Sequence, residues 1–186
     1  MFLCLLIICF GGSAVLGGVY LITYQPIANA QAAKVNQALA GVLPEFDNVP
    51  AEEAYQIQVD GRAVTVYPAK KAGLFEGAAV EAVTTKGFGG PITLMVGFKA
   101  DGTIYNTAVI SHSETPGLGD KMDPKKSDFS LQFKGKNPGT FKLAVTKDGG
   151  QVDAITAATI SSRAFCDAVD LAYRAFRQVA QKGGYQ

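Results

Sequence analysis

The chain has 186 residues, which suits one domain plus an additional element. Its 17 basic and 16 acidic residues nearly cancel, so the sequence lacks the strongly basic field typical of nucleic-acid binding, and we expect no nucleic-acid partner. Hydrophobic residues make up 48% of the chain, which allows a sizeable core, but part of this content is concentrated near Met1.

The first predicted element is a membrane anchor at 1–25. No charged residue occurs from Phe2 to Tyr24, and the first charge is at Lys34. A helix needs about 20 apolar residues to cross a hydrocarbon layer, and this stretch supplies them. A signal peptide is the alternative, because Ala28-Asn29-Ala30 resembles a cleavage site, but the apolar run is long and no basic segment precedes it. We therefore expect a retained, single-pass anchor in a lipid bilayer, whose orientation charge alone does not predict.

A helical connector is predicted at 26–50. The stretch from Pro26 to Leu43 is rich in Ala and Gln, has apolar residues at Val35, Leu39 and Val42, and is stopped by Pro44. The remaining residues, 51–186, would form the folded domain.

Alternating apolar runs separated by turn dipeptides predict β-hairpins. The runs and turns are 55–59, Asp60-Gly61 and 64–66 for the first hairpin, and 92–98, Asp101-Gly102 and 104–110 for the second. A third and less marked case joins 141–146 to 152–155 through Asp148-Gly149-Gly150. Together these runs predict a twisted, mainly antiparallel sheet.

Two helices are expected to flank this sheet. Asp123-Pro124 has the pattern of a cap followed by proline at the first helical position, and Gly135 would end that helix. The last helix should begin near Ile160 and end at Gly183-Gly184. One face of it would carry Ala164, Ala168, Leu171, Ala172, Phe176 and Val179. The predicted fold class is therefore α+β on a single-span anchor.

The cysteines and the single histidine do not define a site by themselves. Cys4 and Cys9 lie in the apolar span and Cys166 lies on the last predicted helix, so no disulfide is expected within the domain. His112 has no Cys or Asp cluster around it in the sequence, which argues against a metal site. A solvated or hydrogen-bonded position at a strand end is one interpretation of His112, and proton handling beside a cofactor is the other.

Three segments depart from the pattern of a plain sheet. The first, Lys86 to Ile92, is rich in glycine, which lets backbone approach closely, but it is no phosphate-binding P-loop because no Gly-Lys-Ser/Thr and no helix follow. The second, Glu114 to Gly119, contains Pro116-Gly117, which favours a tight turn. Such a turn can press backbone N–H groups and Leu118 against a flat ring; the alternative is a surface turn with a solvated glutamate.

The third segment is Asp153 to Thr159, immediately before the last predicted helix. Its two threonines, Thr156 and Thr159, bracket two alanines. Unpaired N–H groups and the dipole at a helix start favour a phosphate, so a phosphorylated group on Thr159 would be stabilised there. The alternatives are that Thr159 is only an N-cap and that Thr156 is an ordinary strand residue.

The pattern Asp153-x-x-Thr156-x-Ala158-Thr159 resembles the flavinylation motif of the FMN-binding domain family. In that family a flavin transferase moves FMN from FAD onto the last threonine, and the resemblance implies a phosphoester between Thr159 Oγ and the FMN phosphate. The family includes the G subunit of the Rnf electron-transport complex and the C subunit of the sodium-pumping NADH:quinone reductase. Ala157 departs from the pattern, because glycine usually holds that position.

Further segments resemble the same family. Glu-Thr-Pro-Gly-Leu-Gly at 114–119 is one of its hallmarks, and the stretches 86–98 and 132–136 are similar to the Rnf G subunit, which favours it over the quinone reductase subunit. The resemblance implies cofactor-binding roles for Asp153, Thr156, Ala157, Ala158, Thr159, Glu114, Thr115, Gly117, Leu118, Gly119, Gly89, Gly90, Lys142 and Lys147. Lys142 and Lys147 would offset the phosphate charge or stabilise reduced flavin, and solvated strand lysines are the alternative.

The resemblance implies an electron-transfer subunit of a membrane ion-translocating oxidoreductase, with covalent FMN, in a bacterial or archaeal cell membrane. The flavin domain would lie on the extracytoplasmic side, and the partners would be the other subunits and the flavin transferase. One alternative is a flavin-free, membrane-anchored scaffold module. Another is a stand-alone flavin reductase or dehydrogenase, for which the sequence offers only His112 and scattered carboxylates as acid–base groups.

Overall fold

The computed structural model of the chain describes residues 2–181. The elements in chain order are α1 (Phe2–Val42), β1 (Tyr55–Val59), β2 (Arg62–Lys71), β3 (Leu74–Thr84), β4 (Ile92–Lys99), β5 (Ile104–Ser111), the short 3₁₀ helices η1 (Gly119–Met122), η2 (Phe129–Phe133) and η3 (Thr146–Asp148), and α2 (Thr159–Gln181). The chain divides into two compact units, Met1–Asn36 and Gln37–Gln186.

α1 is one uninterrupted helix, although it contains Pro26. Large apolar side chains such as Phe10, Leu16 and Leu21 are exposed along its first part. Within the described residues, α1 is the one helix that is long and apolar enough to cross a membrane. The helix predicted from Pro26 is confirmed as its second part, while the division of the chain at residues 25 and 50 stays a prediction.

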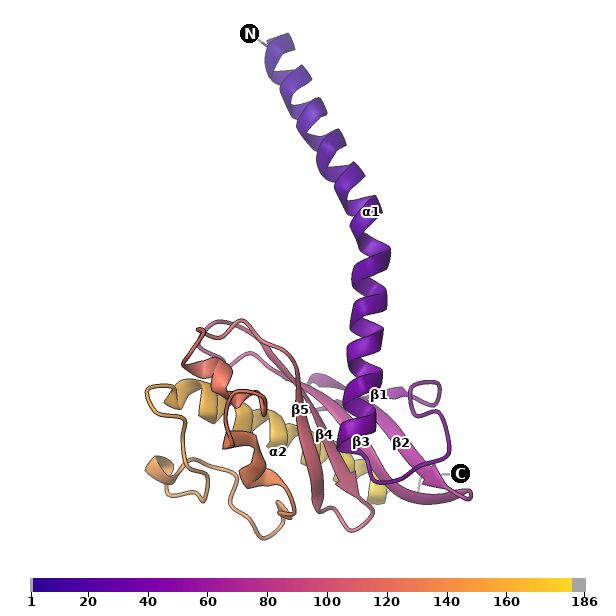
Figure 1. The fold of residues 1–186 in the computed structure, drawn as a ribbon, viewed down its shortest axis with the longest axis vertical. Helices are drawn as coiled ribbons and strands as arrows, with labels where there is room; N and C mark the ends of the chain where they lie inside the picture. The colour runs from indigo at the N-terminus through magenta and orange to yellow at the C-terminus, as the bar shows by residue number, and fades with distance from the viewer. Residues whose placement is uncertain (1, 182–186) are drawn as a thin grey trace. The chain divides into compact units, whose positions relative to one another are not determined.

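The sheet is an antiparallel meander in the order β1-β2-β3-β4-β5 (Figure 1). The first predicted hairpin is confirmed by the pairing of Tyr55 with Val66, and the second by the pairing of Leu94 with Val109. β3 was not predicted. Its turn from β2 is Ala72-Gly73, with φ values of 51° and 78°, and an alanine in the left-handed region gives little sign of a turn in the sequence.

The main core lies between one face of the sheet and α2, which crosses that face (Figure 1). Side chains alternate along each strand, so Ala78, Val80 and Ala82 of β3 all point toward α2. Every residue of the predicted apolar face of α2 is buried. α2 begins one residue before the predicted start, and its predicted end at Gly183-Gly184 lies outside the described residues. Cys166 is buried in this core, and burial raises the pKa of its thiol to about 12.

The last turn of α1 belongs to the C-terminal unit and packs on the opposite face of the sheet. The apolar side chains of Leu39, Val42 and Leu43 are buried there. A Cβ on Gly97 of β4 would lie 1.6 Å from the Val42 carbonyl oxygen, so the helix backbone rests directly on the strand. Asn106 of β5 adds a 3.0 Å hydrogen bond from its side-chain amide to the Gly41 carbonyl.

The predicted helix between Asp123 and Gly135 is wrong. Only η2 forms in that stretch, and Asp123 adopts an extended conformation that ends η1. The Asp123 carboxylate accepts a 2.9 Å hydrogen bond from the Lys125 N–H, and Ser127 Oγ accepts one of 3.2 Å from the Phe129 N–H. These side chains offer the backbone partners other than a helix.

The third predicted hairpin, at 141–155, is also wrong. It is replaced by η3 and one isolated parallel bridge between Val145 and Val152. The N–H groups of Asp148 and Gly150 both donate to the Val145 carbonyl within this loop, and that of Gly149 donates to Thr146. A tight local turn therefore uses the groups that a β-ladder would need.

Candidate functional site

The flavinylation-type motif ends at the first residue of α2. Ala158 occupies the N-cap position, because its carbonyl accepts the first helical hydrogen bond from the Ser162 N–H at 3.0 Å. Thr159 is therefore inside the helix, and the alternative that it serves only as an N-cap is wrong. Within residues 2–181 its hydroxyl has no hydrogen-bond partner. Since alanine has no side-chain oxygen, Ala158 leaves the N–H groups of the first turn uncapped.

The loop before α2 is held in shape by two polar side chains. Ser162 Oγ accepts a 2.9 Å hydrogen bond from the Ile155 N–H and donates one of 3.0 Å to the Ala158 carbonyl. The Gln132 side-chain amide accepts from the Asp153 N–H at 2.8 Å and donates to the Asp153 carbonyl at 3.1 Å. Gln132 thus pairs with the loop backbone as a neighbouring strand would.

Ala157 lies at the bend of this loop with φ 62°. Glycine occupies this left-handed region without a steric penalty, while a Cβ meets the following carbonyl. The conformation gives a physical reason why glycine suits this position of the motif, and it shows that alanine is accommodated.

The turn from Glu114 to Gly119 is confirmed as a tight turn. The Leu118 N–H donates to the Thr115 carbonyl at 3.2 Å, and Gly117 has φ 78°, as the third residue of a type II turn requires. Next to the turn, Asp120 is buried and bonded to Lys126 at 2.6 Å. This ammonium lowers the pKa of the Asp120 carboxyl below its usual range.

Glu114 is not the solvated surface residue that the alternative interpretation supposed. It is 5% exposed, and its two carboxylate oxygens have different partners. Oε1 accepts a 3.1 Å hydrogen bond from the Gly89 N–H, and Oε2 accepts one of 2.5 Å from Ser161 Oγ on α2. The Glu114 N–H donates to His112 Nδ1 at 3.1 Å, so His112 is the hydrogen-bonded strand-end residue of the first interpretation.

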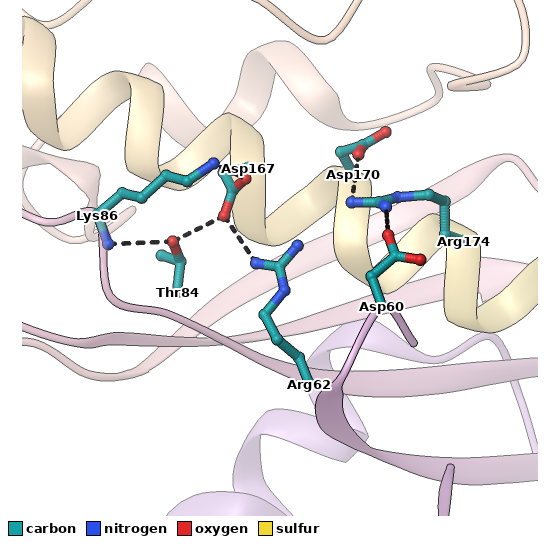
Figure 2. Close-up of polar contacts among 7 residues, drawn as sticks. All are labelled: Asp60, Arg62, Thr84, Lys86, Asp167, Asp170 and Arg174. Atoms are coloured by element: carbon teal, nitrogen blue, oxygen red, sulfur yellow. Dashed lines mark hydrogen bonds and ion pairs between the residues drawn. The ribbon is translucent and has the colours of Figure 1, made fainter. Parts of the chain in front are cut away.

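Lys86, the first residue of the glycine-rich segment, is bonded to Asp167 of α2. Asp167 of α2 accepts hydrogen bonds from Arg62 at 2.9 Å, Thr84 at 2.8 Å and Lys86 at 2.6 Å. Figure 2 shows this group beside a second bridge, in which Arg174 pairs with Asp170 and with Asp60 of the β1–β2 turn. Burial raises the pKa of Asp167, but the hydrogen bonds from its three partners outweigh burial and lower it overall.

These segments enclose a pocket of about 340 Å³, within the usual size range of ligand sites. Its lining is Phe88, Glu114, Thr115, Leu118, Gly119, Ala157, Ala158, Thr159, Ile160 and Ser161. Seven of the fourteen predicted site residues line this pocket, and they come from two distant stretches of the chain. Gly89 lies beside them, bonded to Glu114. The other predicted residues, which are Gly90, Gly117, Asp153, Thr156, Lys142 and Lys147, do not line the pocket.

Three lining residues, Phe88, Ile160 and Ser161, were not among the predicted site residues. Phe88 and Ile160 are large apolar side chains with 69% and 47% of their surface exposed, which makes them suitable walls for a flat apolar ring. A phenylalanine between glycines and a polar Ser161 within the first turn of the last helix are the sequence features that identify them in retrospect.

The residues present fit an FMN group. Phe88, Leu118 and Ile160 supply exposed apolar surface for the ring, and the uncapped start of α2 supplies N–H groups and positive potential for a phosphate. The Thr159 hydroxyl lies at the same place, as the linkage would require.

Comparison with known proteins agrees with this geometry. Residues 87–174 match the FMN-binding domain family, so this part of the chain is an FMN-binding domain. The G subunit of the ion-translocating oxidoreductase complex from Stutzerimonas stutzeri is 36% identical over 168 residues, covering 86% of this chain and 73% of the relative. The corresponding protein of Vibrio atlanticus is 36% identical over 167 residues, covering 84% and 79%, and that of Cereibacter sphaeroides is 40% identical over 148 residues, covering 76% and 67%. The chain belongs to the family of ion-translocating oxidoreductase complex G subunits, which confirms the resemblance to the Rnf protein.

Proposed function

We propose that this chain is an electron-transfer subunit of an ion-translocating oxidoreductase complex and carries FMN on Thr159 through a phosphoester. The observation that carries the proposal is the Thr159 hydroxyl, which has no hydrogen-bond partner in the described part of the chain and lies at an uncapped helix start on the wall of a partly apolar pocket. When bound, FMN supplies the redox chemistry, and the protein binds and orients it.

The residues of the pocket divide this work. The N–H groups and dipole of the first turn of α2 stabilise the negative charge on the free oxygens of the linking phosphate. Phe88, Leu118 and Ile160 cover the ring and exclude water from part of its surface. Lys142 and Lys147 are exposed, so in this proposal they contribute long-range attraction to the phosphate and make no direct contact.

The remaining parts of the proposal concern location. We place α1 in the cell membrane as a single span, with the FMN-binding domain on the extracytoplasmic side, where a covalent bond would prevent loss of the cofactor. Its partners would be the other subunits of the complex and the flavin transferase that attaches FMN.

The test is to produce the full chain with a flavin transferase and measure the intact mass of the purified protein. We expect an increase equal to one FMN less one water, located by peptide mapping on Thr159, and fluorescence on a denaturing gel. Thr159→Ala should lose the adduct completely. Thr146→Ala is the matched control, because it removes an exposed threonine hydroxyl outside the motif and should keep the adduct.

A colourless wild-type chain, produced beside a transferase that modifies another acceptor protein, would support the flavin-free scaffold alternative instead. An adduct that persists in Thr159→Ala would move the attachment to another residue.

A further inference from the structure

Glu114 joins the three segments that form the pocket. One carboxylate oxygen accepts from the Gly89 N–H of the glycine-rich segment, at 3.1 Å. The other accepts from Ser161 Oγ, two residues after Thr159, at 2.5 Å. Glu114 itself begins the tight turn that carries Leu118, so a single side chain sets the spacing between both walls and the helix start.

The backbone at Gly87 and Gly119 packs closely against the Glu114 carboxylate. A Cβ on Gly119 would lie 2.6 Å from Glu114 Oε2 and 2.5 Å from Ser161 Oγ. A Cβ on Gly87 would lie 2.6 Å from Glu114 Oε1. Glycine at these two positions therefore permits the close approach of the turn and the glycine-rich segment to the buried carboxylate.

The charge of Glu114 has no ionic partner. Among the described residues, no lysine, arginine or histidine forms an ion pair with it, and neutral donors satisfy both oxygens. Burying a carboxylate in this way is costly. A glutamine could span the same partners without that cost, since its carbonyl would accept from Gly89 and its amide would donate to Ser161. What the glutamate adds is a fixed negative charge on the pocket wall.

We propose that Glu114 is a positioning residue for the flavin, which fixes the pocket walls against the start of α2 and places a negative charge that lowers the reduction potential of the bound ring. This inference rests on the proposed function, since it assumes FMN in this pocket. Reduction adds electrons to the ring, and a nearby negative charge in a partly desolvated site raises the free energy of the reduced form. The rigid link to Ser161 keeps the distance between the charge and the ring constant.

Two substitutions separate the effect of the Glu114 charge from the effect of its side-chain length. Glu114→Gln keeps the shape and both hydrogen bonds but removes the charge. Glu114→Asp keeps the charge but is one methylene too short to contact Gly89 and Ser161 together. Glu76→Gln, which changes an exposed residue near the start of β3, is the control for removing a charge elsewhere on the domain.

The experiment measures flavin loading by intact mass, the midpoint potential by redox titration and the anisotropy of the flavin, in the full-length protein produced with its transferase. In the flavin-carrying protein, Glu114→Gln should keep the wild-type anisotropy and titrate at a more positive potential than wild type and Glu76→Gln. Glu114→Asp should load but show lower anisotropy, because the pocket walls are no longer held together.

Ser161→Ala gives an independent test, because it breaks the link to α2 while Glu114 is unchanged, and it should also lower the anisotropy. Should Glu114→Gln titrate at the potential of wild type, or Ser161→Ala and Glu114→Asp leave the anisotropy unaltered, the inference is wrong while the proposed function stands. If the wild-type chain acquires no flavin, both this inference and the proposed function are wrong.

Discussion

The loop immediately before the proposed flavin acceptor bends at Ala157, where an alanine adopts a left-handed backbone conformation with φ 62°. The strain is local, because the side chain is exposed and is not part of the core. At the residue scale, a substitution at position 157 therefore changes stability through the backbone conformation and not through packing in the core.

Ala157→Gly should therefore stabilise the domain. Relief of the left-handed strain favours the variant by about 1–2 kcal/mol, and the greater freedom of glycine in the unfolded chain offsets part of this. We expect the free energy of unfolding to rise by about 0.5–1 kcal/mol, measured by urea denaturation of the flavin-free protein. Ala168→Gly, inside α2, should lower it by about 1 kcal/mol or more. A destabilised Ala157→Gly would show that the loop depends on the methyl group.

At the same scale, the sequence was informative where the chemistry is local. The turn at Pro116-Gly117 and the helix start near Thr159 were predicted from short motifs, because a turn or a helix start is set by residues next to one another. Ser161 and Gln132 were missed, since each acts across the fold, on a partner 47 residues away in one case and 21 in the other. A lone serine or glutamine carries no sign of such a contact.

At the scale of elements, the position of α2 on the sheet depends on Asp167. Its carboxylate accepts hydrogen bonds from Arg62 of β2, Thr84 of β3 and Lys86 of the glycine-rich segment (Figure 2). Because its pKa is lower in the folded protein than in the unfolded chain, Asp167 contributes stability above the unfolded pKa of about 3.9. That contribution is lost as the pH falls through the lower folded pKa.

Asp167→Asn should consequently lower the free energy of unfolding by about 1–2 kcal/mol at pH 7, where Arg62 and Lys86 remain partly exposed to water. The difference from wild type should shrink as the pH is lowered below about 4. Urea denaturation at a series of pH values measures it, with the exposed Glu52→Gln as the control. A difference that is constant over the whole series would contradict the assignment of the pKa shift.

Periodicity identified α2, in which one face is buried and the other is not, and the alternating runs around Asp101-Gly102 identified β4 and β5, although β4 is buried on both faces. It failed where the backbone bonds to itself over short range. The stretch 141–155 has apolar residues in a strand-like pattern, yet its N–H groups are used in η3 and its neighbouring turns. β3 was not predicted because its small residues, among them Ala78, Ala79 and Ala82, give little contrast in hydrophobicity between the two faces of the strand.

At the scale of the whole molecule, the C-terminal unit begins inside α1. The helix end covers the face of the sheet that α2 does not cover, with Val42 directly against Gly97. Residues 37–50 thus belong to the same compact unit as the sheet.

A chain that begins at Gln37 should therefore fold, whereas one that begins at Ala51 should be destabilised. Loss of the buried side chains of Leu39, Val42 and Leu43 removes at least about 3 kcal/mol of burial free energy and exposes Met95 of β4. Urea denaturation followed by circular dichroism measures the difference between the two proteins. Equal midpoints would mean that the helix end contributes nothing to the fold.

Cys166 gives the domain a chemical probe of its own opening. Only the thiolate reacts with alkylating reagents, and this thiol is both buried and, with a pKa of about 12, almost entirely protonated at neutral pH. Since Cys4 and Cys9 lie before Gln37, a chain beginning there carries a single cysteine. Its rate of alkylation would then report how often the core between α2 and the sheet opens, with no label added to the flavin pocket.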